Sequence, residues 1–208
     1  MTHVSEKIHL DVILSDRFAD AFTYALHLHR YQSRKVNAVP YISHLMAVAA
    51  LVLEDGGSED EAIAALLHDA VEDQGGEPIY TEILRRYGSQ VAEIVHDCTI
   101  PPCSASQPWK SHKLDYLNQI RHASPEAQRV ILADKLHNVR SLITNLRQTG
   151  ESAWSAFAAS KKDNLWLHQA LADLFEQHVH SSLVAEFRQQ IHILLSLATN
   201  PENQHLVE

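Results

Sequence analysis

Apolar residues along this chain recur three and four positions apart, whereas the alternation of apolar and polar residues that is typical of a half-buried strand is almost absent. This periodicity predicts an all-α protein. Ser, Gly and Pro mark the helix ends, because these residues favour caps and turns. The expected helices cover residues 16–32, 42 to the glycine pair 56–57, 59–73, 79–87, 89–98, 109–122 and 125–147, with two or three more between 151 and 198.

The segment 59–73 combines an apolar run with ionisable residues. It reads EDEAIAALLHDAVED, so that His68, Asp69, Glu72 and Asp73 directly follow residues that are suited to a core. Carboxylates are retained near a core when they are paired, hydrogen-bonded or bound to a metal ion, because burying them alone is costly. A spacing of four places His68 with Glu72, and Asp69 with Asp73, on shared faces of a helix. One helix can therefore supply both metal ligands and a base.

Length, composition and charge narrow the possible functions. A chain of 208 residues can bury a real core, and one domain over 1–208 is the expectation. The net charge of −9 argues against sequence-independent binding of nucleic acid, which depends on Lys and Arg. The longest apolar run, Leu45–Leu53, is far shorter than the roughly 20 residues that cross a bilayer, and charged residues occupy the N-terminus. We therefore expect a cytoplasmic protein that binds neither nucleic acid nor membrane.

Five phrases in fixed order give the His-Asp pair its context. They are HRYQSRK at 29–35, PYISH at 40–44, ALLHDAVED at 65–73, YGSQVAEIVHDCT at 87–99 and LADKLHNVR at 132–140. Together they resemble the HD superfamily of metal-dependent phosphohydrolases, and more specifically the hydrolase domain of the RelA/SpoT alarmone enzymes and the stand-alone small alarmone hydrolases. The resemblance covers about 16–150. We expect the helices from about 151 to 198 to complete the same domain or to form a surface for a homo-oligomer.

The resemblance implies a metal centre and its chemistry. The family's ligand positions fall on His44, His68, Asp69 and Asp134. Two imidazoles and two carboxylates suit Mn²⁺, Fe²⁺, Co²⁺ or Zn²⁺ better than Mg²⁺ or Ca²⁺, which prefer oxygen ligands. The family favours one divalent ion, manganese (Mn²⁺), which polarises the phosphoryl group that water attacks.

The catalytic carboxylates of the family fall on Glu72 and Asp73, which are expected to accept the proton of the attacking water. Two further histidines of the matching phrases, His29 and His137, are expected to orient the ligands instead of contacting the ion.

The implied substrate is guanosine tetra- or pentaphosphate, from which the family removes the 3′-pyrophosphate to leave GDP or GTP. A polyanion of this kind needs cations and hydrogen-bond donors around it. The expected substrate-binding residues are Arg34, Lys35, Lys113, Tyr116 and Asn138.

Two departures from the family pattern keep other substrates open. The stretch from Lys35 to Pro40 is one residue longer and lacks a Gly, and the segment 100–113 is longer and rich in proline. The alternatives are a phosphohydrolase for another nucleotide, such as NADPH or a nucleoside monophosphate, and a non-catalytic binding module with the same fold. The full set of ligands and carboxylates argues against the second alternative.

Overall fold

The computed structural model of the chain describes residues 12–35, 38–101, 103 and 106–199, and within them the prediction of an all-α fold is confirmed. Apart from one isolated bridge between Ser33 and Pro40, the regular structure of these residues is helical. The helices are α1 (Asp16–Leu28), α2 (Ile42–Glu54), α3 (Glu59–Leu67), α4 (Ala70–Gln74), α5 (Glu77–Tyr87), α6 (Ser89–Cys98), α7 (Trp109–His122), α8 (Pro125–Thr149), the 3₁₀ helix η1 (Gly150–Ala156), α9 (Lys161–His178) and α10 (Ser182–Thr199).

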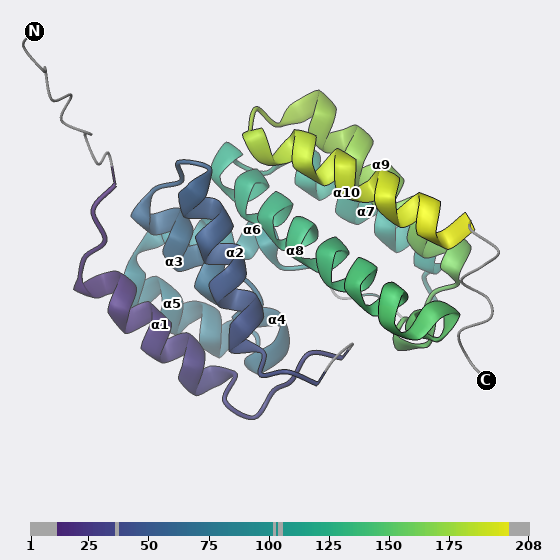
Figure 1. Cartoon of the computed structure of the whole chain (residues 1–208). Helices are drawn as coiled ribbons and strands as arrows, with labels where there is room; N and C mark the ends of the chain where they lie inside the picture. Colours follow the sequence, from purple (N-terminus) through teal and green to yellow (C-terminus); the bar gives the residue numbers. More distant parts are fainter. Residues whose placement is uncertain (1–11, 36–37, 102, 104–105, 200–208) are drawn as a thin grey trace, which may run out of the picture.

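The long helix α8 forms the centre of the molecule. It packs against α2, α3, α6, α7 and α10, and Figure 1 shows it between the N-terminal helices and the pair α9 and α10. One cluster of buried apolar residues extends from Ala21 in α1 to Ala198 in α10. The C-terminal helices thus share a core with the helices that carry the candidate site. None of the described helices is both long and apolar enough to cross a membrane.

The expected single helix over 59–73 is wrong, because the chain bends at His68 and Asp69 and continues as the separate helix α4. Asp69 has φ −94° and ψ −3°, which turns the backbone between the two helices. The Nδ1–H of His68 donates to the carbonyl oxygen of Ala65 at 2.8 Å, so that a side chain satisfies a carbonyl at the end of α3. The bend leaves His68 and Asp69 at the junction of the two helices.

Helix α1 also ends earlier than expected, at Leu28 instead of residue 32. The backbone of the following segment bonds across a loop: Arg34 N–H donates to the Val39 carbonyl at 2.9 Å, and Tyr41 N–H donates to the Gln32 carbonyl at 2.9 Å. These bonds across the loop replace the helical ones. They hold Arg34 and Tyr41 beside the start of α2.

A buried ion network ties the helices together at the end away from α4. Arg129 of α8 bonds both to Glu61 in the first turn of α3 and, at 3.1 Å, to Asp55 after α2. Asp55 also accepts hydrogen bonds from the N–H and the hydroxyl of Ser182, at 3.1 and 2.8 Å, at the start of α10. A single carboxylate therefore joins α2, α8 and α10.

Candidate active site

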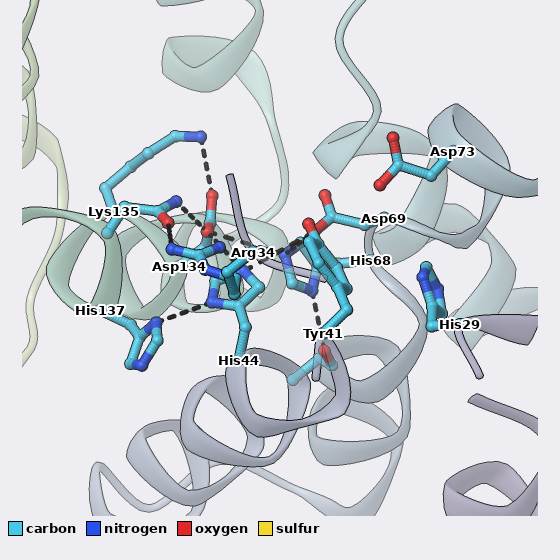
Figure 2. Close-up of polar contacts among 12 residues, drawn as sticks. His29, Arg34, Tyr41, His44, His68, Asp69, Asp73, Asp134, Lys135 and His137 are labelled. Atoms are coloured by element: carbon cyan, nitrogen blue, oxygen red, sulfur yellow. Dashed lines mark hydrogen bonds and ion pairs between the residues drawn. The ribbon is translucent and has the colours of Figure 1, made fainter. Parts of the chain in front are cut away.

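Four predicted metal ligands come together from three parts of the chain. His44 lies in the first turn of α2, His68 and Asp69 lie at the junction of α3 and α4, and Asp134 lies within α8. His44, His68 and Asp134 are buried. Figure 2 shows their side chains converging from these separate elements.

The distances within the cluster are short enough for a shared ion. One donor atom each from His44, His68 and Asp134 lie within 4.8 Å of one another. Nε2 of His44 lies 3.2 Å from Oδ1 of Asp134 and 3.6 Å from Oδ2 of Asp69. Nε2 of His68 lies 3.1 Å from the same Asp69 oxygen and 3.7 Å from the same Asp134 oxygen. Two imidazole nitrogens therefore face two carboxylate oxygens.

Hydrogen bonds behind the two imidazoles turn their Nε2 atoms into the cluster. Nδ1 of His68 donates to the Ala65 carbonyl, and Nδ1 of His44 lies 2.7 Å from Nδ1 of His137. Burial and the nearby charges of His44 and Arg34 lower the pKa of His137 to about 4, so its ring is neutral and can accept this proton. Both Nδ1 atoms thus have a partner outside the cluster, and the Nε2 atoms are the ones that face the carboxylates.

The residues of the cluster fit a divalent cation. Nε2 of His68 is buried without a hydrogen-bond partner, although it faces two carboxylates. Burial lowers the pKa of His68, but Asp69 and Asp134 raise it by more, so that it lies well above its usual value. Burial in turn raises the pKa values of Asp69 and Asp134, yet cationic neighbours hold both well below the usual range. The cluster thus favours positive charge at its centre, which a divalent ion supplies.

Further donors fix the carboxylates of the cluster. Lys135 Nζ donates to Oδ2 of Asp134 at 2.7 Å, and Asn138 Nδ2 donates to its Oδ1 at 2.5 Å. The Tyr41 hydroxyl donates to Oδ2 of Asp69 at 2.5 Å. Neither Tyr41 nor Lys135 is among the site residues that the sequence predicts. In the folded protein both bind ligand candidates directly.

The predicted catalytic carboxylates lie on α4, beside the cluster. Burial and the charge of Asp69 raise the pKa of Glu72, whose Oε2 accepts a weak hydrogen bond of 3.4 Å from the Ile100 N–H. Asp73 accepts a hydrogen bond of 2.7 Å from Gln32 Nε2, and Figure 2 shows it beyond Asp69. Both line the same cavity as Asp69.

This cavity has a volume of about 480 Å³. All five predicted substrate-binding residues line it, namely Arg34, Lys35, Lys113, Tyr116 and Asn138. Lys113 and Lys135 lie with their Nζ atoms 5.7 and 5.3 Å from the centre of the Tyr116 ring. Arg34 donates to Oδ1 of Asn138 at 2.6 Å. The cavity therefore joins a cationic wall to the two carboxylates of α4.

A second wall of the cavity was not predicted. It is formed by Phe157 after η1 and by Leu167, His168 and Leu171 of α9, together with Leu142 of α8. The position of Leu142, eight residues after Asp134, could have been found from helical spacing. The residues of α9 carried no such signal, because the packing of α9 against α7 and α10 brings them there.

Comparison with known proteins identifies the family. A family model described as an HD domain matches residues 21–164. The chain belongs to the HD domain family. The resemblance inferred from the five phrases is thereby confirmed.

Relatives of this HD domain protein include the guanosine-3′,5′-bis(diphosphate) 3′-pyrophosphohydrolase MESH1 of Mus musculus. The two are 34% identical over 171 residues, which cover 76% of this chain and 92% of the mouse protein. The guanosine-3′,5′-bis(diphosphate) 3′-pyrophosphohydrolase of Aquifex aeolicus is 36% identical over 125 residues, but these make up 17% of that protein.

Solved structures show the same fold. A metazoan SpoT orthologue described as hydrolysing ppGpp superimposes with a TM-score of 0.71 at 22% sequence identity, over 89% of this chain and 98% of the other. A Listeria monocytogenes protein superimposes with a TM-score of 0.64 at 27% identity, over 74% of this chain and 99% of the other.

Proposed function

We propose that this HD domain protein hydrolyses guanosine tetra- or pentaphosphate, releasing the 3′-pyrophosphate and leaving GDP or GTP. The observation that carries the proposal is the cavity, which combines the carboxylates of α4 with a wall of Arg34, Lys35 and Lys113. A bis(diphosphate) needs this combination of hydrolytic groups and cations. The names of the mouse and Aquifex relatives support the same substrate.

In this proposal His44, His68, Asp69 and Asp134 hold one divalent ion. Their mixed nitrogen and oxygen donors, and the buried unpartnered Nε2 of His68, support this assignment. The donor set suits Mn²⁺, Fe²⁺, Co²⁺ or Zn²⁺. Among these, the resemblance to the alarmone hydrolases favours manganese (Mn²⁺). Such an ion acts as a Lewis acid toward a phosphoryl oxygen and lowers the pKa of a water molecule.

Glu72 is the proposed general base. Its raised pKa lies closer to neutral pH than that of an ordinary glutamate. A base with a pKa nearer the working pH accepts protons more effectively. Glu72 takes a proton from water as the water oxygen bonds to the phosphorus next to the 3′-oxygen. The bond between that phosphorus and the 3′-oxygen breaks, and the 3′-oxygen gains a proton, which balances the one that Glu72 took from the water. Asp73, held by Gln32, assists in positioning the water.

The cationic wall binds the phosphates. Burial and the nearby charge of Lys135 lower the pKa of Lys113, and a phosphate beside it would restore its preference for the charged form. Arg34 offers a planar guanidinium beside Asn138, which suits a phosphate oxygen pair. Tyr116 supports both lysines through its ring.

The test is incubation of the parent protein with guanosine tetraphosphate and Mn²⁺, with products resolved by anion-exchange chromatography and bound metal measured by mass spectrometry. We compare Asp69→Ala, Glu72→Gln and, as a matched control, Glu93→Gln at an exposed position on α6.

Glu93→Gln should release as much GDP and as much pyrophosphate as the parent. Glu72→Gln should keep its metal and lose turnover, whereas Asp69→Ala should lose both. Absence of pyrophosphate from the parent would overturn the proposal, and release of orthophosphate from NADPH would assign the site to another nucleotide.

A further inference from the structure

The unpredicted wall of the cavity contains one polar side chain among apolar ones. His168 on α9 lines the cavity together with Phe157, Leu167 and Leu171. These neighbours offer flat and aliphatic surfaces and no charge. The part of a ligand that fits here must have apolar faces and must offer a hydrogen-bond partner to the imidazole of His168.

The hydrogen bonding of His168 fixes which proton the ring carries. Its Nδ1 lies 2.8 Å from the carbonyl oxygen of Asn164, one turn earlier in α9. A carbonyl oxygen only accepts, so Nδ1 carries the hydrogen and donates it. Burial and the nearby Lys135 lower the pKa of the ring, which is therefore neutral at pH 7. In a neutral imidazole with the hydrogen on Nδ1, Nε2 is solely an acceptor.

Nε2 of His168 has no hydrogen-bond partner among the described residues. It is also absent from the set of fully buried unpaired atoms, which comprises His29 Nε2, His68 Nε2, Gln119 Oε1 and Trp154 Nε1. The atom is thus not fully buried, and its residue is one of those that line the cavity. The wall presents a single lone pair inside an apolar surface.

A phosphate cannot use this position, because at neutral pH its oxygens are acceptors and carry negative charge. A purine base can, since its faces are apolar and its edge carries N–H donors. We propose that His168 is a specificity-determining residue, whose Nε2 accepts a hydrogen bond from an N–H of the purine base while Phe157, Leu167 and Leu171 pack against the base. This assignment rests on the proposed nucleotide substrate and adds which residue recognises its base.

The experiment measures binding by isothermal titration calorimetry with Mn²⁺ present. The probes are GDP, IDP, which lacks the 2-amino group, N1-methyl-GDP, which lacks the N1 hydrogen, and 2′-deoxy-GDP. The variants are His168→Phe, which keeps a ring and removes the acceptor, and His168→Gln, which restores an acceptor. His192→Phe, exposed on α10, is the matched control.

The parent and His192→Phe should bind GDP roughly three- to tenfold more tightly than whichever of IDP and N1-methyl-GDP lacks the N–H that His168 accepts, as expected for one hydrogen bond. His168→Phe should lose this preference by weakening GDP, and His168→Gln should regain part of it. Equal affinity of the parent for the three base analogues would overturn the inference. So would a preference that responds to 2′-deoxy-GDP instead, because it would assign the contact to the ribose.

Turnover of guanosine tetraphosphate by the same preparations separates the two proposals. Parent protein that reads the base but releases no pyrophosphate would contradict the proposed function and retain the role of His168. Parent protein that hydrolyses the substrate without a base preference would retain the proposed function and contradict the role of His168. A parent that binds none of the four probes would overturn the role of His168.

Discussion

The hydroxyl of Tyr41 donates a 2.5 Å hydrogen bond to Oδ2 of Asp69, the same oxygen that faces Nε2 of both His44 and His68. The Tyr41 ring stacks on His29, with ring centres 5.1 Å apart, and meets the His44 ring edge-on. A loop residue therefore orients a candidate metal ligand that belongs to another part of the chain.

Tyr41→Phe should weaken metal binding, because the ring packing remains while the bond that orients Asp69 is lost. Removing such an outer contact typically costs about 10- to 100-fold in metal affinity or activity. Competition with a chromophoric chelator for Mn²⁺ would measure the loss. Tyr31→Phe, whose parent side chain is 93% exposed, is the matched control and should bind Mn²⁺ like the parent. Unchanged affinity in Tyr41→Phe would show that Asp69 needs no such support.

Lys113→Met should raise KM for guanosine tetraphosphate by about tenfold or more, as expected when a hydrogen bond to a charged group is lost. The matched control is Lys110→Met on the same helix, since Lys110 lies over the Trp166 ring instead of lining the cavity. Steady-state kinetics at several salt concentrations would test this, and the variant should depend less on salt than the parent. Equal KM values for the two variants would remove Lys113 from the phosphate site.

The pH dependence of kcat/KM should report Glu72. A base must be deprotonated to act, and burial together with Asp69 raises the pKa of Glu72, so activity should fall as pH decreases through a value above the usual one for glutamate. Lys135 lowers this pKa, so in Lys135→Met the acid limb should move to higher pH. Stopped assays between pH 4 and 9 would locate the acid limb of the parent and that of Lys135→Met. An acid limb that stays in place in Lys135→Met would contradict the role of Glu72 as the titrating base.

Asp55→Asn should destabilise the fold at neutral pH. Burial raises the pKa of Asp55, but hydrogen bonds from Ser181, Ser182 and Arg129 outweigh this and hold it below its usual value. A carboxyl whose folded pKa lies below its unfolded one stabilises the protein above the unfolded pKa, and that contribution disappears as pH falls through the folded pKa. We expect a loss of about 1–3 kcal/mol at pH 7, from the buried hydrogen bonds to a charged group.

Urea denaturation at pH 7 and below pH 4 would measure this difference, which should shrink at the lower pH. Asp173→Asn provides the control, because Asp173 pairs with Arg188 at the surface and is 50% exposed. Such a pair contributes about 0–1 kcal/mol. A difference for Asp55→Asn that is independent of pH would assign its effect to packing instead of charge.

Helical periodicity and capping residues predicted most of the fold, because both are properties of neighbouring residues. Ser58 and Ser124 begin α3 and α8 where expected, and both accept the hydrogen bonds of an N-cap. The bend at Asp69 and the early end of α1 were not predictable in this way. The early end of α1 depends on backbone bonds across the loop that precedes α2, which local spacing does not contain.

The candidate site likewise contains residues that the sequence predicts and residues that it does not. His44, His68, Asp69 and Asp134 were identified from phrases in fixed order, and the fold brings all four together. The role of Tyr41 as a donor to Asp69 depends on the path of the loop before α2. His168 had no signal in the sequence, because its neighbours in the cavity come from three separate elements.

Helix α8 carries Asp134, Asn138 and Leu142 on one side, from the candidate metal cluster to the apolar wall. At about 1.5 Å per residue, the eight positions from Asp134 to Leu142 correspond to about 12 Å along the axis. A helix is rigid on this scale, so α8 fixes the separation between the candidate metal cluster and the apolar wall. Under the proposed function, a phosphate ester must then have the right length as well as the right charge to contact both.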